Sequence, residues 1–181
     1  MSPLSLLVLF ALLLIATVTD LRSHRIYNWT TYPGLFLAFL LRGLEGGTES
    51  AQEGVGGALA CGGLMLVCFL LFDLGGGDLK LMTMIGAFLG WQRGLEVLLW
   101  TFILGGIGGV AFLVWQQGAW NLMTRAAKHV ANMVKYRGWV PITDADRAPL
   151  QQTLFLAPAA LIAAGIANFD LLQSWWNSSG N

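Results

Sequence analysis

Long stretches of apolar residues dominate this chain, and short polar segments separate them. Six apolar stretches stand out, at residues 4–18, 29–41, 55–72, 81–89, 95–114 and 154–169. A helix needs about 20 mostly apolar residues to cross a bilayer, and most of these stretches approach that length with their flanks. The pattern therefore predicts an all-α, polytopic membrane protein with about six transmembrane helices, of which 81–89 is the shortest.

The composition supports this interpretation. Hydrophobic residues make up 56% of the 181 positions and charged residues only 11%, whereas soluble domains carry about 25% charged residues. So few charges would leave large apolar patches on a water-exposed surface. The 10 basic and 10 acidic residues balance, which argues against a nucleic-acid binder that relies on a basic excess. The expected surroundings are the lipid bilayer, with no nucleic-acid partner.

The distribution of basic residues predicts the orientation. Cytoplasmic loops of membrane proteins are enriched in Lys and Arg. With the amino terminus outside, six crossings leave only Arg42 and Arg93 outside, beside an acidic segment at residues 45–53. The remaining basic residues then face the cytoplasm: Arg22, Arg25, Lys80, Arg125, Lys128, Lys135, Arg137 and Arg147. We therefore expect a multi-pass protein of the inner membrane with its amino terminus outside.

A polar connection at residues 117–150 carries five of these cytoplasmic basic residues. Within it, residues 126–136 fit two structures, an amphipathic helix lying on the lipid headgroups or a solvated loop. We expect the whole connection to be cytoplasmic.

Glycines and cysteines within the apolar stretches are expected to serve packing. Small residues let membrane helices approach closely, and glycines recur in two stretches, at positions 56, 57, 62, 63, 105, 106, 108 and 109. Cys61 and Cys68 lie about 10 Å apart along a straight helix, too far for a disulfide. Without a Cys-x-x-Cys pair, the sequence predicts neither a metal site nor a cofactor.

Two acidic residues at the ends of apolar stretches are the candidates for chemistry. Asp20 follows the first stretch, and Asp78 follows three consecutive glycines. The predicted topology places both at the cytoplasmic side, where two neighbouring carboxylates could share a proton and act as acid and base. The residues alone leave other roles open, as helix caps or as part of an ion or proton pathway. For Asp73 we expect a cap or an interfacial role.

These two segments resemble the type IV prepilin peptidases, which are intramembrane aspartic proteases of the GxGD type. Residues 75–81 read Gly-Gly-Gly-Asp-Leu-Lys-Leu and are similar to the signature around the second catalytic aspartate of that family. Residues 20–28 are similar to the segment with the first aspartate, although Tyr27 stands where the family usually has Pro. The chain lacks the amino-terminal insertion and Cys-x-x-Cys motifs of the larger members. It therefore resembles the short members without methyltransferase activity, which serve Tad-type (Flp) pili.

The resemblance implies one membrane-embedded peptidase domain over residues 1–181. It would cleave the short basic leader of prepilins or pseudopilins at the cytoplasmic face, with Asp20 and Asp78 as the catalytic pair. Gly75 and Gly77 would admit the substrate strand. Lys80 and Asn28 would support the site, Lys80 by anchoring its helix in the headgroups or by lowering the pKa of Asp78. The alternatives are a small ion or proton transporter that uses the same carboxylates and a non-enzymatic subunit of a pilus or secretion assembly.

Overall fold

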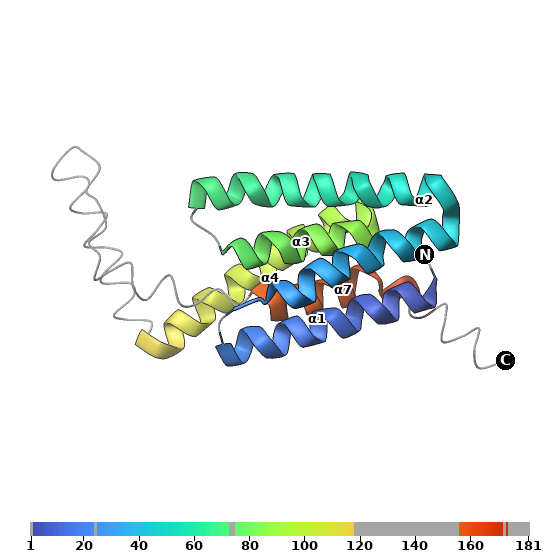
Figure 1. Ribbon diagram of the computed structural model, residues 1–181. Helices are drawn as coiled ribbons and strands as arrows, with labels where there is room; N and C mark the ends of the chain where they lie inside the picture. Colours follow the sequence, from blue (N-terminus) through green and yellow to red (C-terminus); the bar gives the residue numbers. More distant parts are fainter. Residues whose placement is uncertain (1, 24, 73–74, 118–155, 172, 174–181) are drawn as a thin grey trace. The chain divides into compact units, whose positions relative to one another are not determined.

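The computed structural model describes residues 2–23, 25–72, 75–117, 156–171 and 173, and this part of the chain contains helices and no strand. Figure 1 shows the helices, and their bounds are α1 (Pro3–Ser23), α2 (Asn28–Phe72), α3 (Gly76–Leu89), α4 (Trp91–Gln117) and α7 (Leu156–Ala167). The all-α prediction is confirmed. Among the described helices, α1, α2 and α4 are long and apolar enough to cross a membrane.

The described chain forms two compact units. The first comprises Met1–Ile103 with Leu156–Asn181, and the second is Leu104–Phe155. The first unit contains both candidate carboxylates. In the second, the described part is the end of α4, which stays helical through its four glycines. The predicted cytoplasmic connection at 117–150, with its candidate helix at 126–136, lies outside the described residues except for Gln117.

Helix α2 contains both the second and the third predicted crossing. Its 45 residues are interrupted at Gly46 and Gly47, where the backbone leaves helical geometry. Gly47 has φ of 62°, a left-handed value that suits glycine because it has no Cβ. The chain reverses direction here (Figure 1). The polar loop expected around residues 45–53 is therefore mostly helical, and the reversal takes two residues.

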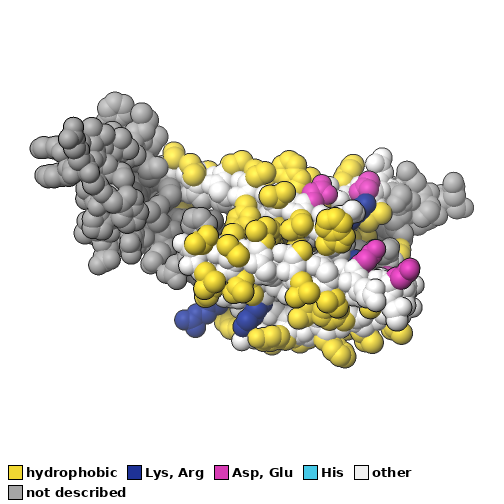
Figure 2. Space-filling model, turned by 90° about the horizontal axis from the view of Figure 1, so that it is seen from above, with side chains coloured by type: hydrophobic (Ala, Val, Ile, Leu, Met, Phe, Trp, Pro, Cys, Tyr) yellow, Lys and Arg dark blue, Asp and Glu magenta, His cyan; other side chains and the backbone are white. Residues whose placement is uncertain are grey.

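Helix α3 is largely buried within the first unit. With 14 residues it is about 21 Å long, shorter than the hydrocarbon thickness of about 30 Å. All its residues from Met84 to Leu89 are buried, and it packs mainly on α2, with further contacts to α1 and α7. The shortest predicted crossing is thus a helix enclosed by its neighbours, whereas Figure 2 shows hydrophobic side chains spread over the outer surface.

Glycine contacts bring the backbones of α2 and α3 together. A Cβ atom added to Gly57 would lie 2.1 Å from the carbonyl oxygen of Gly86, and one added to Gly86 would lie 2.3 Å from that of Gly57. A Cβ atom on Gly62 would lie 2.6 Å from the side-chain hydroxyl oxygen of Thr83 in α3, whereas Gly56, Gly63, Gly106 and Gly108 face open space. The predicted packing role therefore applies to Gly57 and Gly62.

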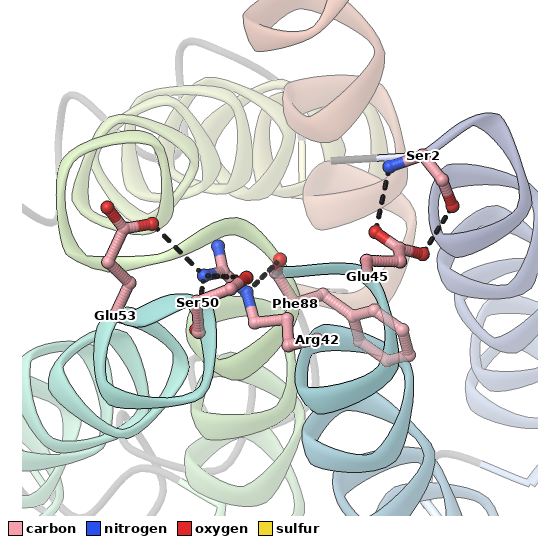
Figure 3. Close-up of polar contacts among 6 residues, drawn as sticks. All are labelled: Ser2, Arg42, Glu45, Ser50, Glu53 and Phe88. Atoms are coloured by element: carbon pink, nitrogen blue, oxygen red, sulfur yellow. Dashed lines mark hydrogen bonds and ion pairs between the residues drawn. The ribbon is translucent and has the colours of Figure 1, made fainter. Parts of the chain in front are cut away.

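A buried arginine fixes the far end of α3. The Arg42 side chain is 6% exposed, and its Nε donates a hydrogen bond to the carbonyl oxygen of Phe88 at 3.0 Å. Its Nη1 donates to the Ser50 carbonyl oxygen at 2.8 Å and pairs with Glu53 at 3.2 Å (Figure 3). Cations are favourable at helix carboxyl ends, where backbone carbonyls lack helical partners. Arg42 thereby joins the reversal of α2 to the end of α3.

Arg93 binds the end of α7 in the same manner. Its Nη1 donates to the Ala167 carbonyl oxygen at 3.4 Å, and its Nη2 pairs with Asp170 at 3.0 Å. Arg42 and Arg93 are the two basic residues that the predicted topology leaves outside. Each has an acidic partner and a helix-end carbonyl.

The start of α1 is tied to the same reversal. The Ser2 amide donates to Glu45 Oε2 at 2.9 Å, and the Ser2 hydroxyl group donates to Glu45 Oε1 (Figure 3). The hydroxyl group of Ser5 donates to the same oxygen. Together with Arg42, these contacts fix the end of the bundle opposite the carboxyl end of α1.

The contact between Gly57 and Gly86 generates a stability prediction. Gly57→Ala should destabilise the protein by about 1–3 kcal/mol, the usual cost of overpacking, because the added methyl group meets rigid backbone. The measurement is the midpoint of thermal unfolding in detergent, followed by circular dichroism. Gly63→Ala makes the same chemical change on the same helix in open space and should leave the midpoint unchanged or raise it. Equal midpoints for the two variants would contradict the proposed packing.

Candidate active site

Asp20 lies on the buried face of α1, in its last turn. The residues of this face follow one another at helical spacing: Leu9, Leu13, Ala16 and Asp20 are all buried. Asp20 itself is 8% exposed. The same periodicity that directs apolar side chains inward therefore also directs this carboxyl group into the protein.

Asp78 occupies the first turn of α3 and is half-buried. Gly75 precedes the helix in an extended conformation, and its carbonyl oxygen accepts a hydrogen bond from the Asp78 amide at 3.1 Å. An acidic residue is favourable at this position because helix amino ends carry partial positive charge. The helix that carries Asp78 thus begins inside the glycine motif, at Gly76.

The two carboxyl groups interact electrostatically. Asp78 precedes the apolar stretch 81–89 and lies outside the three membrane-length helices. Burial and, secondly, the charge on Asp20 raise the pKa of Asp78 to about 7. Asp20 and Asp78 are therefore near enough to repel each other when both are ionised, and a pair of this kind holds one shared proton over a range of pH.

Each of the three glycines before Asp78 has different surroundings. A Cβ atom on Gly75 would lie 2.9 Å from Asp78 Oδ2, and one on Gly77 would lie 3.0 Å from Ile26 Cβ. At Gly76 the same atom would meet nothing within 4 Å. Gly75 therefore borders the carboxylate, Gly76 faces open space, and Gly77 lets α3 begin directly against the α1–α2 connection.

Lys80 and Asn28, both candidates from the sequence, are in direct contact. Lys80 Nζ donates a hydrogen bond to Asn28 Oδ1 at 2.8 Å and lies 5.0 Å from the centre of the Tyr32 ring, within cation–π range. Tyr32 is not among the site residues that the sequence predicts. Its position four residues after Asn28, on the same face of α2, is the signal that could have identified it.

The remaining polar groups predicted near the site differ in exposure. The side chains of Arg22 and Arg25 are exposed. Asp73 lies outside the described residues. Within the described ranges, no group of three or more His, Cys, Asp or Glu side chains could hold a metal ion.

This arrangement can perform general acid–base chemistry. When a proton is shared between two carboxyl groups, the ionised partner can deprotonate a water molecule while the protonated partner donates a hydrogen bond to a substrate carbonyl group. Both groups lie at helix ends, where a substrate can reach them more easily than at the middle of the bundle.

Comparison with known families identifies a peptidase family. The model of the type IV leader peptidase family matches residues 7–110, more than half of the chain, and that range includes both carboxylates, Asn28 and Lys80. Comparisons with curated proteins and with solved structures gave no significant match.

The raised pKa of Asp78 predicts how stability depends on pH. Between the ordinary value of 3.8 and about 7, folded Asp78 keeps a proton that the unfolded chain has released. The free energy of unfolding should therefore fall as pH rises through this window and become flat above it, as far as Asp78 is concerned.

Asp78→Asn should remove this contribution, and Asp20→Asn should reduce it because the repelling charge is gone. Unfolding midpoints measured between about pH 4 and pH 8 for wild type and both variants test the prediction. Identical pH dependence in wild type and Asp78→Asn would contradict it.

Proposed function

The chain belongs to the type IV leader peptidase family, and from that premise we propose that it is an aspartic endopeptidase whose catalytic pair is Asp20 and Asp78. Its substrates would be prepilin-like proteins of the Flp/Tad kind, cut after their short basic leader at the cytoplasmic face of the inner membrane. The electrostatic interaction between Asp20 and Asp78 is the observation that supports this proposal most strongly.

The proposed reaction uses one proton shared by the pair. The ionised aspartate removes a proton from a water molecule, whose oxygen attacks the carbonyl carbon of the scissile peptide. The protonated aspartate donates a hydrogen bond to the carbonyl oxygen, which takes on negative charge. Collapse of the tetrahedral intermediate breaks the C–N bond, and the leaving nitrogen takes a proton from the pair.

The approach of the substrate is proposed to follow the glycines before Asp78. A peptide must be extended to be cut, and an extended chain needs room beside the carboxylate. Gly75 and Gly76 are exposed, and a side chain at Gly75 would press on Asp78. We assign the substrate contact to Gly75 and a packing role against Ile26 to Gly77.

The proposed topology has several passes, with the carboxyl end of α1 in the cytoplasm. The exposed side chains of Arg22 and Arg25 lie at this end. The acidic residues Glu45, Glu49 and Glu53 lie at the reversal of α2 instead. Figure 2 shows acidic side chains gathered toward one end of the surface in view, with a basic side chain beside them and further basic side chains toward the other end. This distribution favours the orientation given by the positive-inside rule.

The catalytic assignment predicts loss of cleavage in two variants. Asp20→Asn and Asp78→Asn should each lower cleavage of a co-expressed pilin-like substrate by about 100-fold or more, because neither leaves an acid–base pair. The measurement is the ratio of uncut to cut substrate on immunoblots. Glu49→Gln, which removes an exposed acid at the α2 reversal, is the matched control and should cleave normally.

Continued cleavage by either Asn variant would refute the assignment. If wild type in liposomes conducted ions and did not cleave, the alternative of an ion or proton transporter would replace it. If the double Asn variant still supported pilus assembly, a non-enzymatic assembly subunit would be the better description.

The glycine assignment predicts different effects at adjacent positions. Gly75→Ala should lower cleavage about tenfold without changing the unfolding midpoint, because its methyl group displaces the mobile end of the Asp78 side chain and a small misplacement of a catalytic group is costly. Gly76→Ala faces open space and should cleave like wild type. Equal rates for the two variants would show that Gly75 does not determine the position of Asp78.

A further inference from the structure

The two proposed catalytic residues come from segments that no single helix connects. Asp20 lies in the last turn of α1, and a short connection leads from there to the start of α2 at Asn28, whereas Asp78 lies in the first turn of α3. A pair that shares one proton requires a defined separation. Some contact must therefore hold the start of α3 against the α1–α2 connection.

Contacts of two kinds join these segments in the part of the chain that the structure describes. One is apolar, where Gly77 packs on Ile26. The other is polar, the hydrogen bond of 2.8 Å from Lys80 Nζ to Asn28 Oδ1. The Tyr32 ring lies against the same ammonium group at 5.0 Å, so the Lys80 side chain is held at two points on α2.

Lys80 and Asp78 lie on different sides of α3. Residues two apart on an α-helix point about 200° apart around the axis, so Lys80 and Asp78 leave α3 on different sides. The causes of the raised pKa of Asp78 are burial and Asp20, and Lys80 is not among them. An ammonium group beside the pair would favour ionisation of both carboxyl groups, which would remove the shared proton.

We propose that Lys80 and Asn28 are positioning residues whose hydrogen bond sets the separation of Asp20 and Asp78, with Tyr32 holding the ammonium group on the side of α3 away from the pair. This inference rests on the proposed function, because it explains how the pair is held. It assigns Lys80 to the enzyme's internal geometry rather than to the headgroups.

The test compares variants that break the hydrogen bond with one that keeps it. Lys80→Met and Asn28→Leu should each lower kcat about tenfold on a peptide with a prepilin-like leader, with KM changed less than threefold. The double variant should be no slower than the slower single variant, because both changes remove one contact. Lys80→Arg retains a donor and a cation for the Tyr32 ring and should keep kcat within about threefold of wild type.

A matched control separates position from charge. Arg22→Met removes an exposed positive charge at the same end of the bundle and should leave kcat unchanged. A loss in Arg22→Met equal to that in Lys80→Met would overturn the proposal in favour of a general charge effect. The proposal would also be overturned if the fold-loss of kcat in the double variant equalled the product of the two single losses. That result would show that Lys80 and Asn28 act independently.

A second readout does not require proteolysis. It uses the contribution of Asp78 to the pH dependence of the free energy of unfolding. This contribution is the difference in pH dependence between a protein and the same protein with Asp78→Asn. It should be smaller in the Lys80→Met background than in wild type, because the two carboxyl groups move apart. Unchanged pH dependence would refute the positioning role even if cleavage fell. If wild type does not cleave but Lys80→Met shows the smaller pH dependence, the positioning role stands and the peptidase proposal fails.

Discussion

The packing of α3 against its neighbours is the constraint on which the site depends. Backbone contact between Gly57 and Gly86 fixes this helix along α2, Arg42 binds its final turn, and Gly77 sets its first turn on Ile26. A helix held at its middle and at both ends has little freedom to slide or rotate. The position of Asp78 relative to Asp20 along the helix axes thus follows from contacts along the whole length of α3.

Much of this arrangement could be predicted from the sequence, because the burial of apolar stretches in lipid is a strong and local signal. The helices and the choice of the two acids, Asn28 and Lys80 as candidate site residues came from the pattern and the family motif. Helix boundaries were less predictable. Apolar stretches mark the part of a helix that sits in hydrocarbon, whereas α1 continues past Val18 to Ser23 because its backbone hydrogen bonds persist in polar surroundings. Asp20 consequently lies within the helix and not after it.

Other features depended on tertiary contacts that a linear pattern does not encode. The reversal of α2 at Gly46 and Gly47 was expected to be a longer loop, since acidic residues around it suggested exposed coil. The sequence also left undetermined which groups the Lys80 side chain contacts, because a long cationic side chain can reach either lipid headgroups or a neighbouring helix. Only the packing of α3 beside α2 brings the Tyr32 ring within its reach.

The environments of Arg42 and Arg93 affect how membrane orientation is inferred from sequence. Each guanidinium group is held by a helix-end carbonyl and an acidic side chain, so each adds little net positive charge to its side of the bilayer in the folded protein. A tally that gives every arginine equal weight understates the electrical asymmetry between the two faces. Topology assignment for small polytopic proteins would improve if arginines in such neutral clusters were discounted before the faces are compared.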